Sequence, residues 1–177
     1  MGTDLLPKFI LENYEIHEWK HACAILKQDF HNEWEDIISL LMDFRLKKSW
    51  ITSGGGRKSK VSDCIDSYLY RRNWVEKEFL TKVVVDDHTT NTPTHKIDCF
   101  KNKVALEIEW NNKDPFYDRD LNNFRLLFDL RAISVGVIIT RCDELQEIFK
   151  ELGRGSSYGA STTHMGKLLP RIEGGSG

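Results

Sequence analysis

Three acidic residues in the middle of the chain have the spacing of a divalent-cation site. Asp98 lies in one short apolar run, and Glu107 and Glu109 lie two residues apart in the next. Alternation along a strand places Glu107 and Glu109 on one face, and a turn at residues 101–103 would bring Asp98 beside Glu107. Carboxylates that close repel one another unless a hard cation such as Mg²⁺ lies between them. A solvated acidic face of a hairpin is the alternative that the spacing leaves open.

Two short strands must hold these carboxylates together. Residues 96–100 and 104–110 are apolar or alternating and flank Lys101-Asn102-Lys103, which favours a tight hairpin. Residues 133–140 form an almost continuous apolar run, which is typical of a strand buried on both faces. These three strands are expected to form the sheet that carries the site.

Apolar residues recur at helical spacing in further segments, and we expect helices there. The predicted helices are residues 16–30, 32–44, 61–73, 121–128 and 145–152. Asn32 and Glu35 have the spacing of an N-terminal capping pair. Residues 79–85 are rich in Val and predict a strand, whereas the polar residues 89–94, with a Pro among them, predict a loop.

The order of these elements is helices, strand, hairpin, helix, strand and helix. It predicts an α/β fold with a mixed central sheet flanked by helices and a helical N-terminal part. We expect a single domain over residues 1–177. Its expected parts are a helical segment (1–52), a catalytic core (53–153) and a basic, Gly- and Ser-rich tail (154–177).

The composition fits a folded, cytoplasmic protein. The 177 residues are 40% hydrophobic and include five Trp and nine Phe, which excludes a disordered or collagen-like chain. No apolar run approaches the length of a membrane span, and the N-terminus does not resemble a secretory signal. The four Cys are widely spaced, which favours buried, reduced thiols over disulfides or a zinc site. The net charge of −2 neither requires nor excludes a nucleic-acid partner.

A second motif predicts different chemistry. His17-Glu18-Trp19-Lys20-His21 matches the H-E-x-x-H signature of zinc proteases, in which two His one helical turn apart bind the metal. On the predicted helix, however, His17, Glu18 and His21 lie opposite the apolar stripe. A solvent-exposed helix face is therefore the alternative to a zinc site.

Two basic segments are candidates for contacts with DNA. The first follows a Gly-rich stretch at a predicted helix N-terminus, where cations contact phosphates, but it lacks the Gly-Lys-Ser/Thr ending of a P-loop. The second lies in the tail and mixes cations with hydroxyl side chains, which suits phosphates and base edges. The candidate residues are Arg57, Lys58 and Lys60 in the first segment and Arg154, His164 and Lys167 in the second. The alternatives are a solvated linker and a mobile surface segment.

The residues of the predicted hairpin resemble a known family. Asp98, a gap of eight residues and then Glu107-Ile108-Glu109 is similar to the metal-binding hairpin of the PD-(D/E)xK nucleases. Glu at the last position resembles the BglII and BamHI group of type II restriction endonucleases. Residues 94–98, 104–114 and 133–141 carry the resemblance, which extends from about residue 53 to the C-terminus.

The resemblance implies roles for individual residues. Asp98 and Glu107 would bind Mg²⁺, and the backbone carbonyl of Ile108 would complete its shell. Glu109 would hold the attacking water. In this family an acidic or amide residue after the preceding helix often joins the site, and Glu76 matches it best.

Three departures from the family pattern bear on these roles. Glu78 is an alternative to Glu76, because the offset of Glu76 is one residue short. Ile97 replaces the Pro of the motif, which is a common and minor change. Glu109 replaces the Lys that would stabilise charge, so water activation would depend more on the metal. The chain ends at Gly177 without the expected further strand, so either the natural protein continues or this sequence is a shortened form.

Together these features predict a Mg²⁺-dependent type II restriction endonuclease that cuts double-stranded DNA as a homodimer. The resemblance and the two-fold symmetry of palindromic sites both imply the dimer. The alternatives are a zinc metalloprotease that uses His17, Glu18 and His21, and a nuclease-like DNA-binding module without catalysis.

Overall fold

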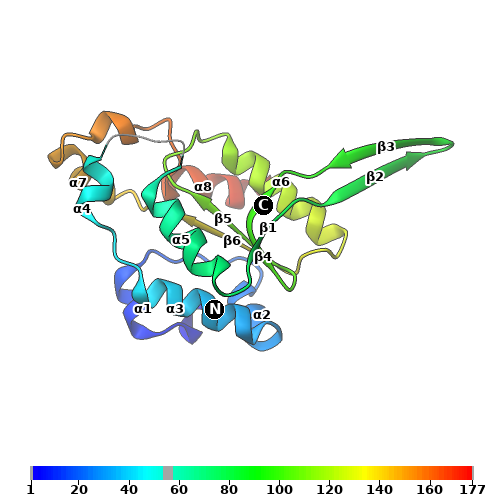
Figure 1. Cartoon of the computed structure of the whole chain (residues 1–177), viewed down its shortest axis with the longest axis horizontal. Coiled ribbons are helices and arrows are strands. Elements are labelled where there is room, and N and C mark those ends of the chain that lie inside the picture. Colours follow the sequence, from blue (N-terminus) through cyan, green and yellow to red (C-terminus); the bar gives the residue numbers. More distant parts are fainter. Residues whose placement is uncertain (1, 54–57, 177) are drawn as a thin grey trace.

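Four strands form the central sheet, in the order β1–β4–β5–β6 (Figure 1). The computed structural model describes residues 2–53 and 58–176. The strands are β1 (Val75–Lys77), β4 (Ile97–Lys101), β5 (Val104–Glu109) and β6 (Val135–Thr140). The β1–β4 and β4–β5 pairs are antiparallel, whereas β5 and β6 are parallel. The prediction of a mixed sheet is confirmed.

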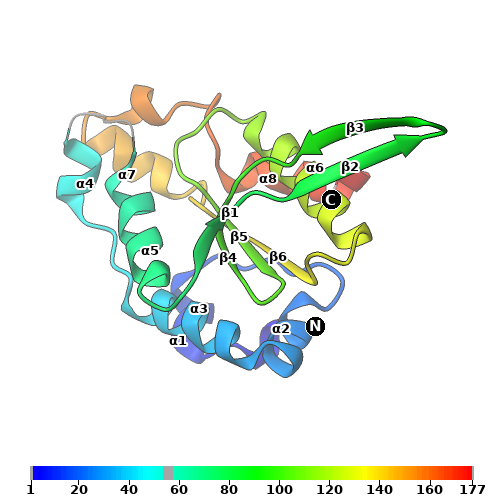
Figure 2. The ribbon, with the colours of Figure 1, turned by 45° about the vertical axis from the view of Figure 1, so that its right-hand side comes forward.

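Helices cover both faces of this sheet (Figure 2). The α-helices are α1 (Lys8–Asn13), α2 (Ala22–Asp29), α3 (His31–Asp43), α4 (Lys48–Thr52), α5 (Lys60–Tyr70), α6 (Phe116–Asp129), α7 (Leu145–Glu151) and α8 (Met165–Arg171). Short helical segments are η1 (Gly2–Leu5), η2 (Gly155–Tyr158) and η3 (Ile172–Ser176). Helix α5 lies against one face of β4 and β5, and α6 lies against β5 on the other. The fold prediction of a sheet flanked by helices therefore holds.

The β4–β5 hairpin forms where alternation and turn residues predict it. Asn102 and Lys103 make the two-residue turn with φ of 43° and 67°, a geometry that matches the twist of paired strands. Cys99 pairs with Leu106 across the two strands. All six residues of β5 are buried, because the strand lies between β4 and β6 and between two helix layers.

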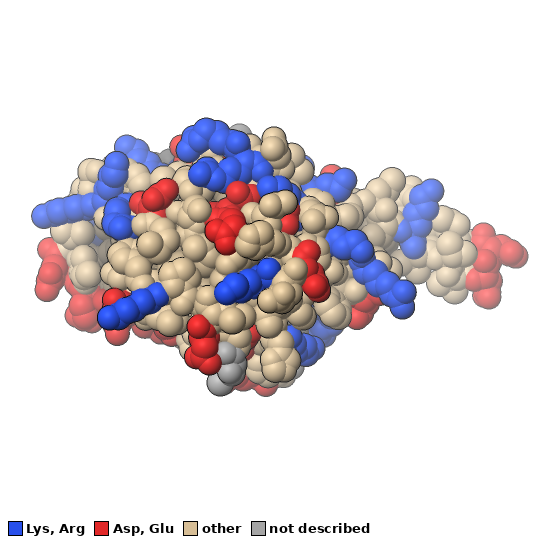
Figure 3. Space-filling view, turned by 90° about the horizontal axis from the view of Figure 1, so that it is seen from below, with Lys and Arg blue, Asp and Glu red and all other residues tan. Residues whose placement is uncertain are grey.

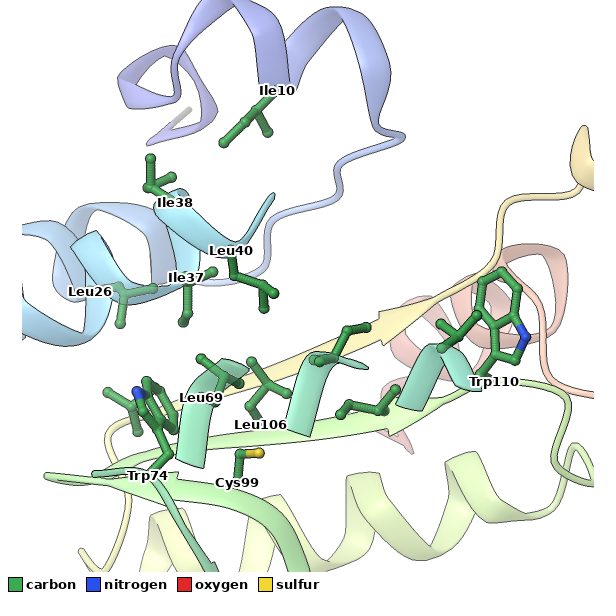
Figure 4. Close-up of a cluster of buried hydrophobic side chains, with 14 of the residues drawn as sticks. Ile10, Leu26, Ile37, Ile38, Leu40, Leu69, Trp74, Cys99, Leu106 and Trp110 are labelled. Carbon is green, nitrogen blue, oxygen red and sulfur yellow. The ribbon is translucent and has the colours of Figure 1, made fainter. Parts of the chain in front are cut away.

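The two faces of β5 contact different cores. Leu106 and Cys99 pack beneath α3 and α5 with Leu40 and Leu69 (Figure 4). Ala105 packs on the opposite face, in a smaller cluster with residues of α6 and the segment that precedes β6. The predicted segregation of apolar and acidic side chains along β5 is confirmed, because Glu107 and Glu109 share the face of Ala105.

The N-terminal helices differ from the prediction in two places. The helix expected at residues 16–30 begins only at Ala22, because Lys20 and His21 adopt left-handed φ values of 52° and 60° that end helical geometry. The expected cap at Asn32 is wrong, since α3 already begins at His31 and has no side-chain cap bond. Helix α5 is capped by Ser59, whose side chain accepts from the amide of Ser62.

A two-stranded arm projects from the body of the molecule (Figures 1 and 2). Strands β2 (Leu80–Val85) and β3 (His88–Pro93) pair only with each other among the strands that the structure describes. The predicted loop at residues 89–94 is therefore wrong, since the Thr-rich segment pairs with its neighbour as a strand. The Val-rich strand exists but lies outside the central sheet, and Val84 remains 65% exposed. The arm ends in acidic side chains (Figure 3), as its Asp86-Asp87 turn requires.

The predicted tail is folded onto the body. Helix α8 lies beyond the helix that the sequence suggested as the last, and it contacts α6. The amide of Thr163 donates to the carbonyl of Asn112 at 2.9 Å, and Thr162 forms a β-bridge with Lys113. The segment therefore extends the structure around the end of β5 and is not a loose surface tail.

The remaining sequence expectations concern membrane spans and cysteines. Within residues 2–53 and 58–176, no helix has the length and apolar character to cross a bilayer. The four Cys are unpaired, as expected, but Cys99 alone is fully buried.

Candidate active site

The structure places Asp98 and Glu107 side by side on neighbouring strands. The amide of Asp98 donates to Glu107 Oε2 at 3.2 Å, and the amide of Ile108 donates to Asp98 Oδ2 at 2.9 Å. These reciprocal bonds fix both carboxylates against the hairpin backbone. The convergence that the sequence predicted for this pair is thus observed.

Glu109 lies on the same face of β5 as Glu107, two residues further along, and its side chain contacts helix α6. Its Oε2 accepts from Asn112 Nδ2 at 2.9 Å, and its Oε1 accepts from Arg119 Nη2 at 3.3 Å. Asp120, the next residue of α6, is 0% exposed and bonds with Arg119 through Oδ1 at 2.8 Å. The carboxyl of Asp120 also reaches that of Glu109, so α6 adds a fourth acidic group.

Asp66 adds a fifth acidic group from α5. It is buried, its Oδ1 accepts from Cys99 Sγ at 3.4 Å, and its other oxygen pairs with Lys58. Its charge acts on the adjacent Asp98. We refer to these five groups as the carboxylate cluster: Asp66, Asp98, Glu107, Glu109 and Asp120.

Sequence reasoning missed the two members of the cluster that helices contribute. The buried face of each predicted helix was assigned from apolar residues alone. In α6, however, Asp120, Asn123 and Leu127 are buried on one side at the spacing i, i+3, i+7. Asp66 likewise lies among the buried residues of α5. Acidic residues within an otherwise apolar helical stripe were the available signal.

Burial makes the cluster unfavourable as a set of free anions. It raises the pKa of Glu107 to about 10, and the charges of Asp120 and Asp98 add to this effect. It also raises the pKa of Glu109, with Asp120 as the next cause, and that of Asp98. Crowded, desolvated carboxylates retain protons unless a positive charge joins them.

Two oxygens of the cluster have no hydrogen-bond partner. These are Glu107 Oε1 and Asp120 Oδ2, and both are buried. Unpaired buried carboxylate oxygens fit a hard divalent cation, which prefers oxygen ligands. No three His, Cys, Asp or Glu side chains of the described residues form a ready-made ligand set, so water would complete the shell, as Mg²⁺ favours. The Ile108 carbonyl, the predicted third ligand, accepts from the Trp110 amide at 3.2 Å.

The predicted extra acidic residue is exposed, unlike these buried groups. Glu76, on β1, is exposed and pairs with Lys96 at 2.7 Å. Glu78, its alternative, is exposed between β1 and β2. Val75 pairs with Phe100 and Lys77 with Ile97, so Glu76 lies on the strand beside Asp98 but at the surface, whereas Asp66 is buried. A part for Glu76 in the site stays a prediction.

The first basic segment lies at one end of the carboxylate cluster. Lys58 pairs with Asp66, and the charge of Asp98 also acts on it. Lys60 begins α5, whereas Arg57 lies outside the described residues. This placement brings Lys58 close to the carboxylates.

The second basic segment is structured, and two of its three candidate side chains are paired. His164 bonds with Asp143, and Lys167 Nζ lies 3.9 Å from Asp114 Oδ2. The Nε atom of Arg154 is buried. A mobile surface segment is therefore not what the structure shows, and DNA contacts there remain a prediction.

The H-E-x-x-H segment does not form a zinc site. His17 and Glu18 lie in an extended segment before α2, and His21 precedes the helix with a left-handed φ. His17 Nε2 instead bonds with Glu15 at 2.9 Å, and Glu18 accepts from the Cys23 amide at 3.0 Å. The helical turn that would align the two His rings is absent from this segment, so this alternative is wrong.

Comparison with known proteins adds an independent finding. A family model described as restriction endonuclease BglII/BglIII matches residues 14–177, which include the whole carboxylate cluster. No curated protein matches the chain in a sequence search.

Proposed function

Because the chain belongs to the restriction endonuclease BglII/BglIII family, we propose that it is a Mg²⁺-dependent type II enzyme that hydrolyses duplex DNA at a specific sequence. The family makes it a nuclease that acts on DNA. The observation that carries the finer proposal is the buried carboxylate cluster with two unpaired oxygens. An acidic interior of this kind suits a cation far better than it suits apolar packing, and the bound cation would in turn attract the phosphodiester.

Asp98 and Glu107 would hold the cation, because they are adjacent and fixed to the backbone of β4 and β5. Asp120 would contribute through a coordinated water that its unpaired oxygen accepts from. When bound, Mg²⁺ supplies positive charge to the phosphate and lowers the pKa of a coordinated water. Removal of the repulsion among the carboxylates would stabilise their ionised forms.

Glu109 would orient the attacking water and accept its proton. Asn112 holds one of its oxygens in place, which fixes the carboxyl for this role. In the reaction, the water oxygen bonds to phosphorus, one P–O ester bond breaks, and the leaving oxygen gains a proton. Asp66 would act on this step only through its charge beside Asp98.

Both strands of the duplex would be cut by a homodimer. A two-fold symmetric protein matches a palindromic site, and each copy would present its own carboxylate cluster to one strand. The basic residues Lys58 and Lys60 lie at the cluster end of α5, where they would contact backbone phosphates.

The test is cleavage of methylation-free genomic DNA with Mg²⁺ and with EDTA, followed by sequencing of the fragment ends. We expect discrete fragments with a shared end sequence in Mg²⁺ and no cleavage in EDTA. Binding to one duplex sequence without cleavage in Mg²⁺ would instead indicate a non-catalytic DNA-binding module. Sedimentation with a cognate duplex would give the number of copies bound.

A further inference from the structure

Arg119 joins two members of the carboxylate cluster from the first turn of α6. Its Nη2 lies 3.3 Å from Glu109 Oε1, and its Nε donates to Asp120 Oδ1 at 2.8 Å. Glu109 stands where the motif of the resembling nucleases has Lys. The structure thus places a cation, Arg119, in contact with the residue that replaces the Lys of the wider PD-(D/E)xK motif.

The contacts of Arg119 within the cluster do not use all of its hydrogen-bond donors. Nε and Nη2 both lie 2.8 Å from the same Asp120 oxygen, Oδ1, while Oδ2 of that carboxylate has no partner. A guanidinium that only neutralised Asp120 would engage both oxygens as a fork. Nε and Nη2 make these contacts, and Nη1 has no bond to the described residues, so Arg119 is only partly satisfied within the cluster.

The guanidinium also faces the surface. The Arg119 side chain is 32% exposed, whereas those of Glu109 and Asp120 are 2% and 0% exposed. It stacks over the Phe116 ring at 4.3 Å, which restricts its orientation beside the cluster. A phosphate that reached Glu109 from solvent would meet Arg119.

Lys58, at the opposite end of the cluster, is the other cation to consider. It pairs with Asp66 on α5 and not with Glu109. The attacked phosphorus must lie beside the residue that orients the water, and in the proposed reaction this residue is Glu109. Position therefore favours Arg119.

We propose that Arg119 is a catalytic residue, which contacts the scissile phosphate and stabilises the charge that develops on it, in place of the missing Lys. This inference rests on the proposed nuclease function. The Arg guanidinium is a planar fork of donors whose Nη1 group has no partner among the described residues, and donors preorganised in this way favour the transition state over the ground state.

The experiment compares Arg119→Gln and Arg119→Lys with wild type and with Lys8→Gln, a charge-matched control on an exposed side chain of α1. Single-turnover cleavage is measured at saturating DNA and at the plateau of each variant's own pH–rate profile. DNA affinity in EDTA and thermal unfolding are measured in parallel. These conditions separate charge stabilisation from changes in binding, titration or folding.

We expect Arg119→Gln to lower the cleavage rate about 100-fold or more, with DNA affinity changed by less than about tenfold. Arg119→Lys should recover part of the rate, because it keeps the charge but not the fork. If Arg119→Gln does not fold, Arg119→Lys must still cleave at least about tenfold more slowly than wild type.

Two outcomes would overturn the inference. A wild-type rate in Arg119→Gln, or in Arg119→Lys where only that variant folds, would show that Arg119 does not contact the reacting phosphate. The proposed function would survive this result, because wild type and Lys8→Gln would still cleave. Absence of cleavage by wild type would instead refute the proposed function and the inference with it.

Discussion

The two successive β-hairpins of this chain, β2–β3 and β4–β5, have opposite environments. The first is an arm whose Leu80 and Val84 are 71% and 65% exposed. The second lies inside the sheet, and every residue of β5 is buried. β-Branched residues therefore predict a strand but not its burial, which depends on the neighbouring elements. Only the second hairpin has helices on both faces and a parallel neighbour, and it carries the carboxylates.

The largest expected effect comes from the carboxylates of the buried hairpin. Asp98→Asn and Glu107→Gln should each reduce cleavage about 1,000-fold or more, because each removes a negative charge from the proposed cation site. Specific DNA should still bind, and binding should strengthen slightly as repulsion between carboxylates and phosphates falls. Single-turnover cleavage and a binding titration measure the two effects.

The matched control for these variants is Glu76→Gln, which changes an exposed carboxylate on β1. Near-normal cleavage by this control would indicate that the buried carboxylates, and not the exposed Glu76, take part in the reaction. Wild-type cleavage by Glu107→Gln would contradict the site assignment. Loss of cleavage in Glu76→Gln would restore Glu76 as the extra acidic residue that the sequence suggested.

The buried hairpin should also make stability depend on pH. Folding raises the pKa of Glu107 from 4.5 to about 10, so the folded state holds a proton that the unfolded state releases. Without Mg²⁺, the free energy of unfolding should therefore fall between about pH 5 and pH 9, by at most about 1.4 kcal/mol per pH unit for this proton. Denaturant titrations in EDTA at several pH values measure the slope.

Glu107→Gln should flatten this slope, because the amide mimics the protonated acid and does not titrate. Mg²⁺ should stabilise wild type at pH 8 more than the variant, since a ligand that binds only the folded state adds to its stability. If the free energy of unfolding depends equally on pH in wild type and Glu107→Gln, Glu107 is not the group that holds a proton in the folded state.

The difference between the hairpins also explains what the sequence could predict. The β4–β5 hairpin and its acidic face follow from local alternation and a turn at Asn102 and Lys103, so they were predictable. Asp66 and Asp120 come from helices distant in sequence, and local spacing does not encode their approach to Asp98. The Val-rich β2 resembles a core strand in composition, and nothing local indicates that it extends into solvent.

The arm should contribute little to the stability of the body. Replacement of residues 81–92 by a two-residue Asn-Gly turn should change the free energy of unfolding by about 1 kcal/mol or less, because most of its side chains are exposed. Thermal and denaturant unfolding measure the effect. A much larger loss of unfolding free energy would show that the arm stabilises the central sheet. The β2–β3 hairpin would then not differ from β4–β5 in its contribution to stability.

The smallest expected effect concerns the charges near each hairpin. Lys58→Gln and Lys60→Gln should each flatten the dependence of log DNA affinity on log salt by about 0.9, the value for one lost phosphate contact. Lys82→Gln on the arm is the matched control and should leave the slope unchanged, since the acidic turn at Asp86 and Asp87 disfavours a phosphate backbone. Titrations of a specific and a random duplex over a salt series measure these slopes. A flatter slope with Lys82→Gln alone would place the DNA on the arm rather than on the end of α5 beside the carboxylates.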